Sequence, residues 1–403
     1  MLKTIRIVLA AFFFTGITWL FLDVTETAQH LLGWMARIQF LPAILALSIG
    51  IVALLVLLTL IFGRIYCSTI CPLGVFQDIC AWLGTRRKKN RYHFSKARNP
   101  LRYGALAAFI ALSILGVHSL ALLLAPYSGY GRIAQNLFSP VYRAGNNLLA
   151  LLAERANSYA FSASDIFIRS WPAFVITFIF FTVIVFLAIR HGRLWCNTLC
   201  PVGTVLGFLA RFSWFKPVLD NSACVSCHAC EQRCKASYID IETHSVDASR
   251  CVACMNCIGN CPQGAIHYGH SCQKDENKQM NKDVAAPLSA FAATRRNLLL
   301  ALPAVLSSTI PANAAQNTEG NRTDGGLAEL KPRKAPKRIW PLRPPGSQSQ
   351  KNFRTRCTAC QLCVAACPNG VLRPSSAPLG FMQPEMGFER GFCRPECRRC
   401  SEV

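Results

Sequence analysis

The feature that most constrains this 403-residue chain is a cysteine spacing that recurs along it. The run C-x2-C-x2-C-x3-C occurs three times, and a related C-x3-C-x2-C run closes the sequence. Such a run lets one loop wrap three corners of an iron–sulfur cube while its fourth cysteine reaches a second cube. Zinc sites usually use two short pairs, and an odd total of 21 cysteines, most of them clustered, argues against disulfides. The spacing predicts 4Fe–4S clusters.

The first two runs predict a small α+β domain over residues 216–270, a two-cluster bacterial ferredoxin fold. In that fold the fourth cysteine of each run ligates the other cluster. One predicted ligand set is Cys224, Cys227, Cys230 and Cys261. The other predicted set is Cys251, Cys254, Cys257 and Cys234. Pro262 follows the second run, whereas Lys235 stands where proline often follows the first.

The last two runs predict a second ferredoxin domain over residues 351–403. By the same crossing rule, one set is Cys367, Cys393, Cys397 and Cys400. The remaining three, Cys357, Cys360 and Cys363, lack a fourth ligand. We expect a further Cys-Pro beyond Val403, which makes this domain incomplete. If Val403 is the true end, the last cluster is three-ligated, of a 3Fe type, or absent.

A membrane domain is predicted over residues 1–215. Hydrophobic residues make up 52% of the chain, and four long segments lack Asp, Glu, Lys and Arg. These segments are 7–22, 38–63, 103–131 and 170–189. Each can hold a helix of about 20 residues, enough to cross a bilayer, the first being the shortest. Backbone pairing in hydrocarbon requires helices, so we expect four transmembrane helices.

Basic residues orient these spans. The loop from Arg64 to Arg102 carries nine Lys or Arg and one acid, Asp78. The positive-inside rule places this loop, the N-terminus and the region after Arg190 in the cytoplasm. The net charge of +23 is therefore interpreted as topogenic and not as a nucleic-acid footprint. The prediction is a multi-pass protein of the cytoplasmic (inner) membrane with the first ferredoxin domain in the cytoplasm.

The second and fourth spans end in near copies of one motif, G-R-x-x-C-x-T-x-C-P-x-G. Its cysteines are Cys67, Cys71, Cys196 and Cys200. Residues at i and i+4 share one face of a helix, and proline then limits its continuation. Two such pairs would supply four thiolates to one cluster, act as redox thiols without a cluster, or be buried structural thiols. Arg64 and Arg193 are expected to anchor the spans at lipid headgroups, with a quinone contact as the alternative.

The segment 271–350 is predicted to be a linker with an export signal. Arg295 and Arg296 precede a leucine run that ends in small residues around Ala314, as in a twin-arginine signal. A fifth membrane helix and a cytoplasmic surface helix remain alternatives. Export would place the C-terminal module in the periplasm. Cys80 and Cys272 are unassigned and are expected to be structural.

Residues 1–270, with their paired C-x3-C-P motifs and two-cluster module, resemble NapH-type membrane quinol dehydrogenase proteins and the related part of NosR-type proteins. The part from Thr294 onward resembles the start of a NapG-type exported ferredoxin fused behind them. The resemblance implies oxidation of membrane quinol and delivery of electrons toward a periplasmic reductase. The cysteines named above are the residues that carry over. A NosR-like flavin segment is not evident in the sequence.

We therefore expect an electron-transfer component of a quinol dehydrogenase. Its predicted partners are the membrane lipid and quinone pool and a partner redox protein or reductase, with no nucleic acid. Two other functions are compatible with the sequence. One is an iron–sulfur maturation or regulatory factor for another metalloenzyme, and the other is a membrane metal-binding protein without a redox cycle.

Overall fold

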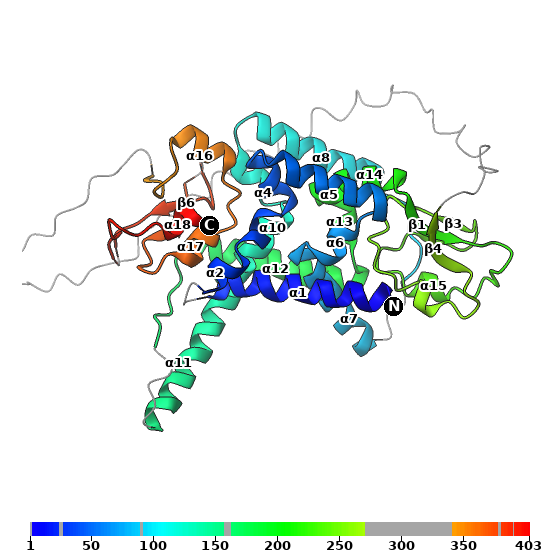
Figure 1. Ribbon diagram of the computed structural model, residues 1–403, viewed down its shortest axis with the longest axis horizontal. Helices are drawn as coiled ribbons and strands as arrows, with labels where there is room; N and C mark the ends of the chain where they lie inside the picture. The colour runs from blue at the N-terminus through cyan, green and yellow to red at the C-terminus, as the bar shows by residue number, and fades with distance from the viewer. Residues whose placement is uncertain are drawn as a thin grey trace, which may run out of the picture. The chain divides into compact units, whose positions relative to one another are not determined.

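The computed structural model describes residues 2–23, 27–88, 92–156, 163–270, 341–377, 380–389 and 391–403 (Figure 1). The predicted export signal around Arg295, Arg296 and Ala314 lies outside these residues, as does Cys272. The described part is an α-helical region followed by two cysteine-rich modules with short strands. We call residues 216–270 the first module and residues 351–403 the second module.

Within the described residues, two helices are long and apolar enough to cross a membrane. They are α1 (Leu2–Leu22) and α12 (Trp171–His191), each of 21 residues. The sequence expectation of two further unbroken spans is not met. One is divided into α4 (Phe40–Leu45) and α5 (Ile49–Phe62), the other into α8 (Asn99–Ile114) and α9 (His118–Ala121). The first of these segments loses its helical conformation at Leu47 and the second at Gly116. Their φ angles of 56° and 78° are positive and so end a right-handed helix. Four crossings remain a prediction.

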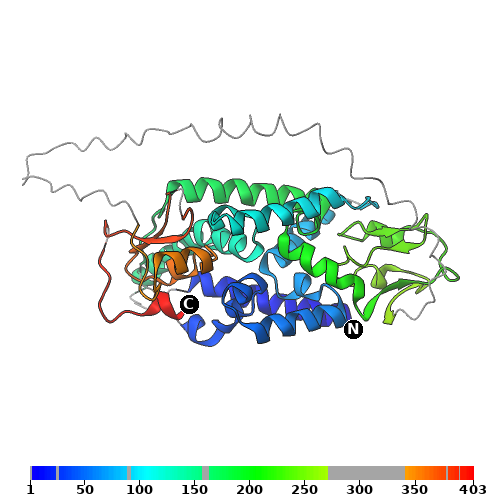
Figure 2. The same ribbon diagram turned by 90° about the horizontal axis from the view of Figure 1, so that it is seen from above.

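The repeated motif forms two matching hairpins. In the first, α5 is followed by α6 (Ile65–Thr69) and α7 (Pro72–Lys88); in the second, α12 is followed by α13 (Leu194–Thr198) and α14 (Pro201–Leu209). Proline suits the first turn of a helix, where its missing N–H is not needed. Pro72 and Pro201 therefore begin the last helix of each hairpin. Helix α7 packs against both α12 and α1 (Figure 2).

Further helices complete the region. Between α1 and α4 lie α2 (Thr27–Leu32) and α3 (Trp34–Arg37). After α9 come α10 (Pro126–Ile133), a π-helical turn η1 (Ala134–Phe138) and α11 (Ser139–Arg155). After α14 a 3-10 turn η2 (Ala210–Phe212) leads into the first module. The core of the region contains aromatic residues such as Tyr66, Phe76 and Tyr130 together with three of the four motif cysteines.

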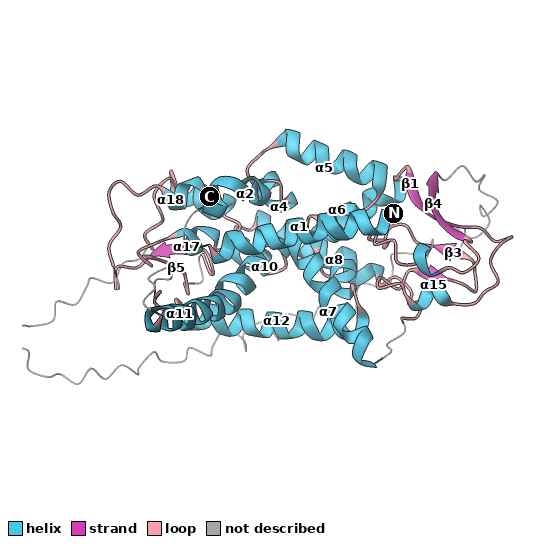
Figure 3. Cartoon of the chain, turned by 60° about the horizontal axis from the view of Figure 1, so that its bottom comes forward, coloured by secondary structure: helices cyan, strands magenta, loops and turns pink. Residues whose placement is uncertain are grey.

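The strands of the described chain lie in the two modules (Figure 3). In the first, β1 (Phe215–Leu219) pairs antiparallel with β4 (Ile266–His270), and β2 (Ile239–Asp240) with β3 (Ser245–Val246). It also holds α15 (Ala229–Gln232) and the 3-10 turn η3 (Ile258–Asn260). In the second, β5 (Leu372–Pro374) pairs antiparallel with β6 (Pro384–Met386). Its helices are α16 (Gln350–Arg356), α17 (Leu362–Ala366) and α18 (Arg399–Glu402).

The two modules are joined to opposite ends of α1, the first of them through α7. Near its start, Arg6 pairs with Asp78 of α7, which also pairs with Lys235 of the first module. At its other end, a Cβ on Gly131 would meet both Phe21 of α1 and the carbonyl oxygen of Cys360 in the second module. A helix of this length spans about 30 Å. The helical region therefore separates the two sets of clustered cysteines.

Candidate iron–sulfur sites

The loops that carry three of the cysteine runs share a backbone geometry. On either side of the second cysteine in each run, a non-glycine residue has a positive φ, between 49° and 65°. These residues are Ser226 and His228, Ala253 and Met255, and Ala359 and Gln361. Such left-handed residues are costly and concentrate at functional sites. Alternating left- and right-handed residues also form concavities of N–H groups that hold anions and iron–sulfur clusters.

The N–H groups of these loops point at sulfur. Ala253 N–H donates to Cys251 Sγ at 3.3 Å, and Ala359 N–H donates to Cys357 Sγ at 3.4 Å. Across the described residues, no three His, Cys, Asp or Glu side chains converge closely enough to hold a single metal ion. A cubic cluster keeps its thiolates further apart than a single ion does. The N–H groups that these loops direct at sulfur fit an anionic 4Fe–4S cluster.

The first module brings its cysteines together in two sets. Burial raises the pKa of Cys234, and Cys254 and Cys251 raise it further. Burial also raises the pKa of Cys230, with Cys261 and Cys224 acting in the same direction. This is the crossed arrangement that the spacing predicts, although ligation itself stays a prediction. We call Cys234, Cys251, Cys254 and Cys257 the inner set, because all four are buried. The outer set is Cys224, Cys227, Cys230 and Cys261, of which Cys227 is exposed.

The second module also groups its cysteines. Burial, together with the neighbouring thiols, raises the pKa of Cys400 to about 11; these thiols are Cys367, Cys393 and Cys397. The pKa of Cys363 is raised by burial and then by Cys357 and Cys360. The three-cysteine set expected from the sequence is therefore a cluster of neighbours in the structure.

The four cysteines of the membrane motif meet inside the helical region, and we call them the bundle set. Cys67, Cys71, Cys196 and Cys200 are each at most 4% exposed. Burial raises the pKa of Cys71, and Cys196 and Cys67 raise it further. The sequence predicted that the two cysteines of each pair lie on one helix, and in the structure they do not. Cys71 lies in the break between α6 and α7, and Cys200 caps α14, where Gly203 N–H donates to its Sγ at 3.3 Å.

The arginine of each repeat donates a hydrogen bond to a backbone carbonyl of the other repeat. Arg64 Nη2 donates to the carbonyl oxygen of Cys196 at 3.2 Å, and Arg193 Nη1 to that of Cys67 at 2.7 Å. Both guanidinium groups are fully buried. The expectation that these arginines anchor the spans at lipid headgroups is therefore wrong. Sequence reasoning considered each repeat alone, whereas the exchange depends on how the two repeats pack.

The bundle set fits an anionic group. Arg64 Nη1 donates hydrogen bonds to Asn197 Oδ1 and to the carbonyl oxygen of Ser249. Within the described residues, no carboxylate forms an ion pair with Arg64. A buried cation without a counter-charge costs several kcal/mol. A 4Fe–4S cluster on four thiolates is negatively charged and would supply that counter-charge. The donor set, its burial and its facing cations all suit such a cluster.

Arg64 also joins the bundle set to the first module. Burial raises the pKa of Cys251 and Arg64 lowers it, and Arg64 contacts Ser249, two residues earlier in the chain. Arg102 of α8 donates to the same Ser249 carbonyl oxygen at 3.2 Å. A single buried side chain thus lies between the bundle set and the inner set.

Asp78 is the centre of a second buried contact. Arg193 Nε donates to its Oδ1 at 2.9 Å, Arg6 pairs with its Oδ2, and Lys235 Nζ lies 3.4 Å from Oδ1. Burial alone would raise the pKa of Asp78, but these three cations hold it well below its usual range. Lys235, the residue that replaced proline after the first run, therefore docks the first module onto α7.

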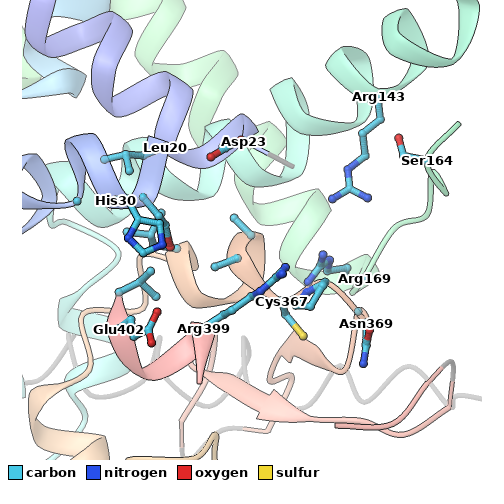
Figure 4. A pocket seen from close by; sticks show the side chains of 18 of the residues that line it. Leu20, Asp23, His30, Arg143, Ser164, Arg169, Cys367, Asn369, Arg399 and Glu402 are labelled. Carbon is cyan, nitrogen blue, oxygen red and sulfur yellow. The ribbon is translucent and has the colours of Figure 1, made fainter. Parts of the chain in front are cut away.

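A mixed-charge cavity of about 760 Å³ adjoins the second module. Figure 4 shows Arg143 and Arg169 on the right of it, His30 and Glu402 on the left, and Arg399 reaching in from the lower left toward Cys367. Arg169 donates to the carbonyl oxygens of Val364 and Leu372, which fixes the second module against the start of α12. Sequence reasoning did not single out these residues.

Comparisons with known proteins agree with this chemistry. Two family models match, and both are described as a 4Fe-4S binding domain. One covers residues 43–91 and 173–220, the two membrane repeats, and the other covers 244–267 and 353–373. The fold and its sites therefore define a protein with multiple 4Fe–4S clusters.

Among curated proteins, the chain is similar to the ferredoxin-type protein NapH of Haemophilus influenzae, at 28% identity over 55% of this chain and 68% of that protein. The putative electron transport protein YccM of Escherichia coli is 24% identical over 55% of each chain. The methylamine utilization ferredoxin-type protein MauN of Paracoccus denitrificans is 27% identical over 56% of this chain and 64% of its own. The chain thus spans between about half and two thirds of these relatives. No solved structure matches.

These likenesses support the NapH-type resemblance of the membrane repeats and the first module. The likeness of the second module to a NapG-type protein stays a prediction, as do the individual ligand assignments.

Proposed function

We propose that this protein conducts electrons from membrane quinol to a partner redox protein. The observation that carries the proposal is that the bundle set and the inner set are neighbours in the structure. The bundle set lies within the helical region, and Arg64 links it to the inner set. Bound 4Fe–4S clusters would supply one-electron transfer at these sites. The chain's own part is to bury the thiolates, donate N–H groups to them and place cations beside them.

We further propose that the two modules lie on opposite sides of the cytoplasmic membrane. The first module is joined to the start of α1 through Asp78 of α7, and the second module contacts its end. Positive-inside orientation places the start of α1 in the cytoplasm. This arrangement supports an exported, NapG-like second module, reached after the linker, that passes electrons to a periplasmic reductase.

The direct test is anaerobic reduction of the purified protein in detergent. A quinol analogue such as menadiol is expected to produce the EPR signals of reduced clusters, with dithionite as the control for total reducible clusters. Clusters that respond to dithionite but not to menadiol would instead favour a maturation or regulatory factor. Zinc without acid-labile sulfide would contradict the iron–sulfur assignment.

Cluster binding by the bundle set has its own test. Cys71→Ser is expected to lower the iron content by about four atoms per chain, since one ligand of a 4Fe–4S cluster is lost. Cys80→Ser is the matched control, because Cys80 is a buried thiol on α7 outside every cysteine set. Equal iron content in Cys71→Ser, Cys80→Ser and the unchanged protein would show that the bundle set holds no cluster.

A further inference from the structure

We propose that the quinol headgroup binds in a cavity between α1, α7 and the first module, with Tyr92 and Arg6 as its hydrogen-bond donors. This inference rests on the proposed function and names its substrate site. The cavity, here called the α1–α7 pocket, has a volume of about 740 Å³, within the range of small-molecule sites. Figure 1 shows α7 and α15 near the start of α1.

The pocket has an apolar side suited to a ring and an isoprenoid tail. Ile7, Ala11 and Phe14 of α1 face Ile79 and Trp82 of α7. Ile7 is 47% exposed and Trp82 is 48% exposed, so the apolar lining continues onto the outer surface of the helices. Helix α1 is long and apolar enough to cross a membrane. A lipid-soluble molecule can therefore enter sideways from the bilayer.

The other side of the pocket carries two buried donors that lack an acceptor. Tyr92 is 5% exposed, and within the described residues its hydroxyl has no hydrogen-bond partner. Arg6 is 8% exposed, and its Nε–H is likewise without a partner there, although its Nη2 pairs with Asp78. Leaving a buried donor unpaired is unfavourable, so such a donor favours a ligand that supplies an acceptor. A quinone presents carbonyl oxygens to such donors, and the quinol hydroxyls keep oxygen lone pairs at the same positions.

The polar side also adjoins the inner cysteine set. Burial raises the pKa of Tyr92 to about 12, and smaller contributions come from Asp78, Cys234 and Cys254. The Tyr92 backbone N–H donates to the carbonyl oxygen of Gln232 at 3.1 Å, two residues before Cys234, so Tyr92 lies beside the inner set. Asn256 and Asn260, from the loop that carries Cys257, line the same pocket. A headgroup bound here would be close to an electron acceptor.

The redox chemistry balances with groups already named. The quinol loses two electrons and two protons and becomes the quinone. The electrons are taken one at a time by oxidised 4Fe–4S clusters, which the partner protein reoxidises, and the protons pass to water.

Two variants test the site in the full-length protein. Tyr92→Phe removes the unpaired hydroxyl, and Ala11→Trp fills the apolar side. We expect Tyr92→Phe to weaken menadione binding about three- to tenfold in equilibrium dialysis, and Ala11→Trp to weaken it by more than about tenfold. Both should slow cluster reduction by menadiol while leaving reduction by dithionite unchanged.

Each variant has a matched control. Tyr127 is a buried tyrosine whose hydroxyl also lacks a partner in the described residues, but it lies beside Cys360 of the second module. Val8 is an exposed α1 residue that does not line the pocket. Tyr127→Phe and Val8→Trp are therefore expected to bind menadione as the unchanged protein does.

The outcomes separate the site from the function. Normal menadione binding and normal menadiol reduction in both Tyr92→Phe and Ala11→Trp would overturn the pocket and leave the quinol-linked function standing. An unchanged protein that neither binds menadione nor is reduced by menadiol, while dithionite reduces its clusters, would overturn both.

Discussion

At the residue scale, two glycines at equivalent repeat positions have different surroundings. Gly63 and Gly192 both have a φ of 62°, with ψ of −156° and −113°, a region that only glycine adopts readily. A Cβ on Gly63 would meet nothing closer than 3.7 Å. A Cβ on Gly192 would overlap the backbone carbonyl of Lys235. The second turn is therefore also a docking point for the first module.

This difference gives a paired prediction. Gly63→Ala should destabilise the protein by about 1–3 kcal/mol through backbone strain alone. Gly192→Ala should cost more, because the Lys235 backbone must also move away. Thermal unfolding in detergent measures both variants. Equal losses at the two positions would mean that the close approach of Lys235 does not matter.

The cysteines could be predicted from their spacing, but the residues that support them could not. In each run the first three cysteines are close together and the fourth is assigned to the other cluster, so the spacing alone predicts crossed ligand sets. The positive φ of Ala253, Met255 and Gln361 carries no sequence signal, because none of them is a residue typical of turns. Arg64 and Arg193 were visible as a repeated residue. The hydrogen bonds that each arginine makes to the other repeat could not be predicted, because they depend on tertiary packing.

At the scale of elements, one carboxylate holds four segments together. Asp78 on α7 pairs with Arg6 of α1, Arg193 between α12 and α13, and Lys235 of the first module. Sequence reasoning saw Asp78 only as the single acid in a basic loop. The long apolar runs predicted α1 and α12 well, but the breaks at Leu47 and Gly116 were not anticipated. A run free of charges shows that a segment is apolar and not that its helix is continuous.

Loss of this carboxylate should be severe. Asp78→Asn leaves three buried or half-buried cations without their shared partner, which we expect to cost about 3–5 kcal/mol. The depressed pKa of Asp78 in the folded state means that its stabilising effect is present above its unfolded pKa of about 3.9. It is lost only as the pH falls toward the folded value. The difference in stability between the unchanged protein and Asp78→Asn should therefore be constant from about pH 5 to 8.

Thermal unfolding at several pH values measures this difference. Glu242→Gln is the control, since Glu242 is an exposed carboxylate of the first module, and it should change stability by less than about 0.5 kcal/mol. If the difference in stability between the unchanged protein and Asp78→Asn shrinks as the pH is lowered from 8 to 5, Asp78 is not held in its charged form.

At the scale of the whole molecule, the described unit joins two cluster modules through a helical region. Ser128 Oγ donates to the carbonyl oxygen of Thr358 at 2.5 Å, and Arg169 donates to Leu372 at 3.0 Å, so the second module docks beside α10 and the start of α12. The end of α12 reaches the first module, where Arg193 N–H donates to the Lys235 carbonyl oxygen at 2.9 Å. Like α1, α12 is about 30 Å long, close to the hydrocarbon thickness of a bilayer.

If α1 and α12 cross the membrane, their contacts place the two modules on opposite sides, and reporter fusions to the full chain test this. Alkaline phosphatase is active only outside the cytoplasm, and β-galactosidase only inside. We expect a fusion before Met1 to show β-galactosidase activity and a fusion after Val403 to show alkaline phosphatase activity. The basic segment of residues 315–356 opposes this result, because positive charge favours the cytoplasm, whereas the docking of the second module at the Phe21 end of α1 favours it. β-Galactosidase activity at both ends would place both modules in the cytoplasm and would contradict a crossing of the bilayer by α1 and α12. Phosphatase activity after Val403 that is lost on Arg295→Lys together with Arg296→Lys would show that the twin-arginine segment carries the module across.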